Sequence, residues 1–150
     1  MSQSLSNVLV HIIFSTKYRA PLIDESIQPE LYAYITSIVS SHGSYLHKIG
    51  GIADHVHLLS SLPRTLSISS FLEEIKKSSS KWIKTKDSRY HHFSWQKGFG
   101  VFSVSCSQKN DVVAYISNQK ERHKKMSYQD EFRKLLQLNE VPYDERYVWD

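Results

Sequence analysis

The residues best suited to chemistry are His55 and His57, which stand two positions apart in an apolar run. In an extended strand, alternate side chains share a face, so both imidazoles would point the same way with Cα atoms about 6.6 Å apart. Two imidazoles at this spacing can converge on one metal ion, while Val56 and Leu58 are buried on the opposite face. The pair could equally be two ordinary strand residues, because a chain with eight histidines produces close pairs by chance. Asp54 should point away from His55, so we expect it outside the set of direct ligands.

A second group of candidates lies on a helix that we expect from about residue 107 to residue 126. Tyr115, Gln119 and His123 recur every four residues and therefore share one helix face. A phenol beside an amide and an imidazole could act as a nucleophile with metal ligands or proton-transfer partners. A tyrosine pKa near 10 makes it a poor nucleophile unless a cation or a base lies nearby. The histidine pair could hold that cation, although Tyr115 could also be one of nine tyrosines that pack the core.

Charge is unevenly distributed along the chain. The net charge is +4, but residues 76–125 contain twelve Lys and Arg against three acidic residues. Concentrating positive charge costs self-repulsion unless a polyanion binds, and nucleic acid is the common polyanion. A solvated lysine-rich helix face is the alternative explanation. The distribution favours a protein that binds nucleic acid.

Length and cysteine usage limit the class of protein. A chain of 150 residues is most simply one domain, here with a core of about residues 5–126 and a C-terminal helix and acidic tail over 127–150. The single cysteine, Cys106, excludes a disulfide framework within the chain. No signal peptide or membrane-length apolar run is recognisable. We therefore expect a cytoplasmic protein.

The order of the expected elements predicts the fold class. Strand-like runs cover residues 8–14, 45–49, 54–62 and 98–105, and helical spacing covers residues 30–41, 68–84, 107–126 and 128–136. We expect the chain to break or bulge at Gly50-Gly51. The order β-α-β-β-α-β followed by helix predicts an α+β, ferredoxin-like antiparallel sheet with an added C-terminal helix that carries Tyr115. The RNA-recognition motif shares this arrangement, so the fold alone does not select a function.

Several segments together resemble one family. His55-Val56-His57 resembles the His-hydrophobic-His signature of HUH endonucleases, and residues 115–119 (Tyr-Ile-Ser-Asn-Gln) resemble the catalytic helix of single-tyrosine transposases of the small insertion-sequence type, including the REP-associated ones. Residues 11–19 resemble the first strand of the family, residues 77–81 its basic helix, and residues 93–105 its Trp-Gln and final-strand block. The resemblance spans nearly the whole chain.

The resemblance implies an activity and a site. His55, His57 and Gln119 would hold one Mg²⁺ or Mn²⁺, and Tyr115 would attack a phosphate of single-stranded DNA to form a 5′-phosphotyrosine link that a hydroxyl later resolves. It also implies imperfect hairpin ends as substrate and a homodimer, possibly with composite active sites. Two imidazoles and an amide are a weak site for a hard cation, so we expect weak binding without DNA and a preference for Mn²⁺.

Further residues are candidates for DNA contact. We expect Lys76, Lys77 and Lys81 to meet phosphates, with Lys17 and Arg19 as additional contacts. Trp95 could stack on an unpaired base, although core packing competes, and His123 could relay protons or touch phosphate. Two other functions stay open: a non-catalytic ferredoxin-like domain that binds single-stranded nucleic acid, and an HUH nuclease of the replication-initiator or relaxase type.

Overall fold

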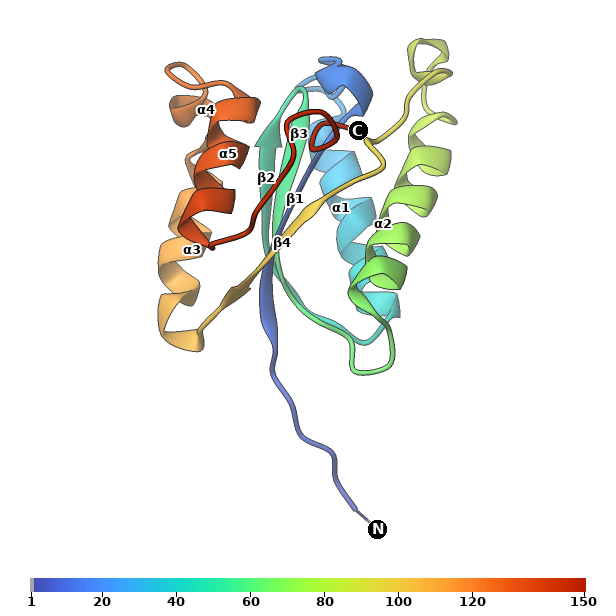
Figure 1. Ribbon diagram of the computed structural model, residues 1–150. Coiled ribbons are helices and arrows are strands. Elements are labelled where there is room, and N and C mark those ends of the chain that lie inside the picture. Colours follow the sequence, from blue (N-terminus) through green and yellow to red (C-terminus); the bar gives the residue numbers. More distant parts are fainter. Residues whose placement is uncertain (1) are drawn as a thin grey trace.

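The fold is built on one four-stranded antiparallel sheet, seen in a computed structural model that describes residues 2–150 (Figure 1). The strands β1 (Leu9–Ser15), β2 (Leu46–Ile52), β3 (His55–Ser61) and β4 (Gly100–Val104) follow the spatial order β2-β3-β1-β4. Helix α1 (Gln28–Ser41) connects β1 to β2, and α2 (Ile68–Ile83) connects β3 to β4. Short 3₁₀ turns lie at Lys17–Arg19, Ser88–Tyr90 and Cys106–Gln108. The ferredoxin-like prediction is confirmed.

Helices cover both faces of the sheet, so the molecule has three layers (Figure 1). Helices α1 and α2 pack on one face, where Val10, Ile12 and Phe14 of β1 join the larger core cluster. The other face carries α3 (Lys109–Ser117) and α5 (Tyr128–Leu138), with Ile13 in a smaller cluster. Because successive side chains of a strand point to opposite faces, β1 and β3 contribute side chains to both layers.

A serine hydroxyl sets the N-terminal start of both α2 and α5. Ser67 precedes α2, and its hydroxyl accepts a hydrogen bond from the backbone N–H of Ser70. Ser127 does the same for α5 with the N–H of Asp130. A serine in this position satisfies one of the otherwise unpaired N–H groups of the first turn. Helix α5 therefore begins one residue after Ser127, as the sequence predicts.

The single helix predicted over residues 107–126 is wrong. Helix α3 ends at Ser117. Asn118 has φ −100° and ψ 21°, outside the helical conformation, and a second helix, α4 (Gln119–Arg122), begins after it. The first residues of the predicted helix form the 3₁₀ turn Cys106–Gln108 instead. Tyr115 and Gln119 therefore lie on two helical segments rather than on one continuous face.

The expected break at Gly50-Gly51 is also different in the structure, because β2 continues through both glycines to Ile52. A Cβ atom at Gly50 would lie 2.8 Å from the backbone oxygen of Ile116, and one at Gly51 would lie 2.2 Å from the oxygen of His55. The missing side chains thus let α3 lie directly on β2 and let β2 lie close to the start of β3.

None of the helices in residues 2–150 has the length and apolar character needed to span a membrane.

Candidate active site

The two histidines of β3 lie on the face of the sheet that α3 and α5 cover. Antiparallel pairing sets His57 opposite Ile13 and His55 opposite Ser15 of β1. Both imidazoles are fully buried. The alternation that buries Val56 and Leu58 in the larger core therefore points His55 and His57 together into the smaller layer, as the sequence predicts.

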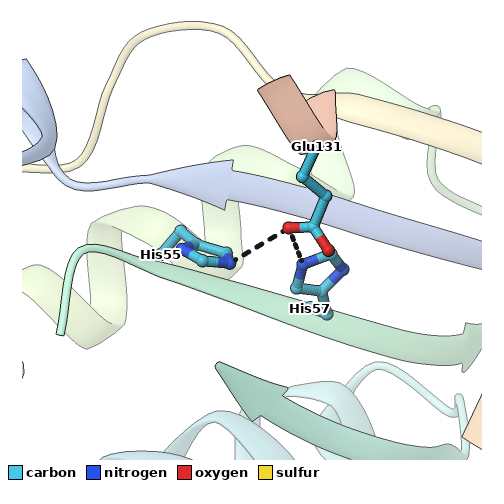
Figure 2. Close-up of side chains that lie close together, drawn as sticks. All are labelled: His55, His57 and Glu131. Atoms are coloured by element: carbon cyan, nitrogen blue, oxygen red, sulfur yellow. Dashed lines mark hydrogen bonds and ion pairs between the residues drawn. The ribbon is translucent and has the colours of Figure 1, made fainter. Parts of the chain in front are cut away.

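A buried carboxylate from α5 meets both histidines (Figure 2). Oε1 of Glu131 lies 3.0 Å from Nε2 of His57 and 3.3 Å from Nε2 of His55. One ligand atom from each of the three residues lies within 4.8 Å of the others. Glu131 is only 1% exposed, so this charge exists in the interior only because donors surround it. His55, His57 and Glu131 together are called the triad below.

Gln119 and His123 complete the ring of polar atoms around Glu131. Oε1 of Gln119 lies 3.0 Å from Nε2 of His55, and its amide nitrogen donates to Oε2 of Glu131 at 3.0 Å. Nε2 of His123 lies 3.0 Å from Oε1 of both Gln119 and Glu131. The structure therefore brings the predicted ligand Gln119 to the histidine pair within one chain, and Glu131 contacts both.

The groups of the triad have strongly altered acidities. Burial alone would raise the pKa of Glu131, but hydrogen bonds from His123, His55 and His57 hold it well below its usual range. Burial would lower the pKa of His55, yet hydrogen bonds from it to Asp54 and Glu131 raise it to about 9. For His57 the effect of burial exceeds that of the contact with Glu131, and the pKa falls to about 4. Near neutral pH the triad therefore holds one imidazolium, one neutral imidazole and one carboxylate.

Two further residues hold the outer nitrogens of the histidine rings. Oδ1 of Asp54 lies 2.7 Å from Nδ1 of His55, and Nε2 of His11 lies 2.8 Å from Nδ1 of His57. The expectation that Asp54 points away from His55 is therefore wrong, because the Asp54 carboxylate binds the outer nitrogen of the His55 ring and orients it. Outer hydrogen bonds of this kind fix ring orientation and leave Nε2 pointing toward the site.

Tyr115 of α3 reaches the same carboxylate. Its hydroxyl donates to Oε2 of Glu131 at 2.5 Å. The guanidinium carbon of Arg122 lies 4.0 Å from the centre of the Tyr115 ring, and Nε of Arg122 is buried without a hydrogen-bond partner. Burial and the neighbouring Glu131 raise the pKa of Tyr115, while Arg122 acts in the opposite direction. In this state the tyrosine is a neutral phenol held beside the triad.

The donor set fits a divalent ion. Neighbouring ligands of an octahedral ion with bonds of about 2.1 Å lie about 3.0 Å apart. The contacts between the triad, Gln119 and His123 have this separation, from 3.0 to 3.3 Å. Two imidazoles with one carboxylate suit first-row divalent metals, and the carboxylate and amide oxygens also suit Mg²⁺. This is a stronger site for a hard cation than two imidazoles and an amide alone.

The residues predicted to contact DNA are scattered over the molecule. Lys77 and Lys81 are exposed on α2, on the face of the sheet opposite the triad. Lys76 turns inward, and its ammonium donates to the carbonyl oxygens of Gln96, Lys97 and Gly98. Burial lowers the pKa of Lys76 to about 8.

The remaining candidates border the end of the sheet near the C-terminus. Lys17 is exposed in the turn after β1, and Arg19 donates to the carbonyl oxygen of Trp149. Trp95 is 6% exposed and packs edge-on against Phe14. The structure therefore brings none of the candidate DNA contacts except His123 to the triad.

Glu131 was missed by the reading of the sequence, although a signal was present. The helix over residues 128–136 was expected, and its apolar face includes Tyr128, Phe132 and Leu135. Glu131 is three residues after Tyr128 and four before Leu135, so it lies on that apolar face rather than opposite to it. An acidic residue in an apolar stripe is rarely buried without a partner, and the partners here are the two predicted ligands.

Comparison with known proteins agrees with this architecture. The model of the family described as IS200-like transposases matches residues 4–119. A solved structure from Deinococcus radiodurans R1, assigned as a transposase, has a TM-score of 0.61 and 23% identity over 79% of this chain and 98% of its own. A REP-associated tyrosine transposase bound to a REP hairpin has a TM-score of 0.60 and 18% identity, over 82% and 74% of the two chains. Among curated proteins, none matches the sequence.

Proposed function

Because the chain belongs to the IS200-like transposase family, it is a transposase acting on single-stranded DNA, and we propose that Tyr115 is its nucleophile. The observation that supports this most is the hydrogen bond from the Tyr115 hydroxyl to Glu131, a carboxylate shared with two histidines of metal-binding geometry. A tyrosine that only packed a core would not need a buried carboxylate at its hydroxyl.

The proposed reaction is a transesterification. The Tyr115 oxygen attacks a phosphorus of the DNA strand, a P–O(Tyr) bond forms, and the P–O3′ bond breaks to release a 3′-hydroxyl. Oε2 of Glu131 already accepts the Tyr115 hydrogen bond and can relay its proton to the departing 3′ oxygen as the new bond forms. Later a 3′-hydroxyl attacks the 5′-phosphotyrosine and displaces the tyrosine, so no water or nucleotide is consumed.

We further propose that His55, His57 and Glu131 hold one Mg²⁺ or Mn²⁺, with Gln119 and His123 as additional donors. A bound divalent ion supplies charge stabilisation for the phosphate in the transition state. Arg122 lies over the Tyr115 ring, and its Nε makes no hydrogen bond but lies 3.7 Å from Oε2 of Glu131, so its guanidinium can contact the same phosphate from the tyrosine side. Asp54 and His11 keep the ligand rings oriented.

The partners follow from the family and from the charge distribution. We propose that hairpin ends of single-stranded DNA are the substrate, as in the REP-associated relative that was solved with a hairpin. Lys77, Lys81 and Lys17 are exposed and can meet phosphates away from the triad, whereas Lys76 would act by holding the loop 96–98.

A homodimer is proposed from the family alone, and the Tyr115–Glu131 contact supports a tyrosine that serves its own chain. The single domain over 1–150 and the cytoplasmic location stay predictions.

One experiment tests the proposal. The protein is incubated with Mn²⁺ and single-stranded DNA from both flanks of its own gene, and a denaturing gel is examined for a covalent protein–DNA adduct. The expected result is an adduct that needs the metal and is lost in Tyr115→Phe. The matched control is Tyr147→Phe, an exposed tyrosine of the C-terminal segment, which should keep the adduct. Binding of DNA without an adduct under any divalent metal would favour a non-catalytic binding module.

A further inference from the structure

A cavity of about 350 Å³ lies between β4, α3 and α5, and the ring of Tyr115 forms part of its wall. The hydroxyl at the end of the same ring donates to Oε2 of Glu131. The cavity and the triad therefore both border the proposed nucleophile. Its volume lies within the range of about 300–1,000 Å³ that is typical of small-molecule sites in proteins. A group bound in the cavity would lie next to the phosphate that Tyr115 attacks.

The buried side chains of the cavity wall are aromatic or apolar. Phe102, Leu135 and His11 are all buried and line it together with Tyr115. The His11 ring lies edge-on to the rings of Phe102 and Tyr115, with centroid distances of 6.5 and 5.8 Å. Unpaired nucleic acid bases bind proteins by covering aromatic side chains with their flat faces.

Two polar groups of the cavity have no partner in the part of the chain that the structure describes. His11 is 6% exposed, and its Nε2 contacts His57 while its Nδ1 makes no hydrogen bond. Asp111, in the first turn of α3, makes no ion pair and no side-chain hydrogen bond. A nucleobase carries its donors and acceptors along its edges, so it can pair with such groups while its faces cover the apolar wall.

The charge of the lining favours a base over a phosphate. Among residues 2–150, no Lys or Arg lines the cavity, and the carboxylate of Asp111 would repel a phosphate. A carboxylate accepts hydrogen bonds, which the exocyclic amino groups of cytosine, adenine and guanine can donate. Thymine presents an oxygen and a methyl group instead. The lining therefore suits a neutral base that carries an amino group.

We propose that the cavity binds one unpaired nucleobase of the DNA strand, from a nucleotide next to the cleaved phosphate, and prefers a base with an exocyclic amino group; this rests on the proposed function of Tyr115. Phe102, His11 and the Tyr115 ring cover the base, and Asp111 accepts from its amino group. Binding of the base holds the neighbouring phosphorus at the Tyr115 hydroxyl, so the cavity contributes to the choice of the cleavage position.

DNA with one base removed tests this proposal. The cleaved position is mapped from the length of the DNA released in the adduct reaction, and oligonucleotides that lack one base are made for the two nucleotides that flank it. Affinity is measured by fluorescence anisotropy with Tyr115→Phe, which keeps the ring but forms no adduct. Removing the base on one flank should weaken binding by about 5- to 100-fold, because its stacking on aromatic side chains is lost.

Two further variants in the same background connect this effect with the cavity. Val112→Trp fills the cavity, so intact and base-free DNA should bind with equal affinity. Asp111→Ala removes the acceptor, so a preference of about tenfold for an amino-bearing base over thymine should fall below about threefold. Glu30→Ala, the control, removes an acidic residue from the first turn of α1 on the opposite face of the sheet and should keep both effects.

Equal affinity for intact and base-free DNA at both flanks would overturn the proposal, as would a base effect that both cavity variants leave unchanged. In either case, an adduct formed by the wild-type protein leaves the proposed function intact. Self-association of the protein that Val112→Trp abolishes, without any base effect, would assign the cavity to a second copy of the chain instead. If the wild-type protein forms no adduct with any divalent ion, Tyr115 is not its nucleophile and both proposals fail together.

Discussion

At the residue scale, one carboxylate connects every reactive group of the site. Oε1 of Glu131 contacts His57 and His123, and Oε2 accepts from Tyr115 and Gln119. A buried carboxylate with several donors is strongly stabilised in its charged form, and removing the charge leaves those donors without a partner. Glu131 is therefore the residue whose loss should disturb the ligand set and the Tyr115 contact together.

Replacing Glu131 with Gln should lower Mn²⁺ affinity by at least about tenfold, because a neutral amide is a poorer ligand for a hard cation. The covalent adduct with DNA should fall in parallel, since the Tyr115 proton loses its acceptor. Glu74→Gln, on α2 and on the opposite face of the sheet, is the control and should keep both properties. Titration with Mn²⁺ and the adduct gel measure the two effects. Full Mn²⁺ affinity in Glu131→Gln would remove Glu131 from the ligand set.

The acidities of the triad predict how stability of the metal-free protein depends on pH. The pKa of His55 is raised to about 9, against about 6.5 in an unfolded chain. The stability from its proton is fully present below about pH 6.5 and is lost as pH rises through about 9. The pKa of His57 is lowered to about 4, so stability is also lost as pH falls from about 6.5 toward 4.

Thermal unfolding in a chelator should therefore show a maximum near pH 6.5. Adding Mg²⁺ should reduce the loss on the alkaline side, because a bound ion replaces the proton of His55 in the folded state. A melting temperature that rises steadily from pH 6.5 to 9 without metal would contradict the ion pair between His55 and Glu131.

At the element scale, the position of Tyr115 depends on how α3 lies on the sheet. The backbone oxygen of Ile116, the neighbour of Tyr115, lies 2.8 Å from where a Cβ atom of Gly50 would be. The break at Asn118 then lets α4 turn Gln119 toward His55. Neither feature was visible in the sequence, since residues 107–126 contain no Gly or Pro and the break depends on packing against β2.

Gly50→Val should displace α3 from β2 and reduce adduct formation strongly. Overpacking of this kind costs about 1–3 kcal/mol of stability, so the protein should still fold while Tyr115 is misplaced. Ala114→Val places the same valine side chain on the exposed side of α3 and should leave adduct formation nearly unchanged. Melting temperature and adduct yield are compared for both variants. Normal adduct yield in a folded Gly50→Val protein would show that the close contact does not position Tyr115.

At the scale of the whole molecule, the sheet separates the site from the basic face of α2 (Figure 1). The order of strands and helices could be predicted because apolar periodicity directly reports which residues are buried. The histidine pair could be predicted because two residues on one strand face are local in sequence. The apolar stripe of α5 marks Glu131 as buried, but its partner could not be predicted, since it meets His57 across 74 residues and the contact depends on how α5 folds back on the sheet.

The most direct test of the central claim, that the triad holds the catalytic ion beside Tyr115, is an anomalous difference map from crystals grown with Mn²⁺. One strong peak is expected about 2.1 Å from Nε2 of His55, Nε2 of His57 and Oε1 of Glu131. The Tyr115 hydroxyl should lie on the side of the ion that faces solvent-accessible space. A fully occupied Mn²⁺ peak elsewhere, with the triad still joined only by its own hydrogen bonds, would show that the triad is not the metal site.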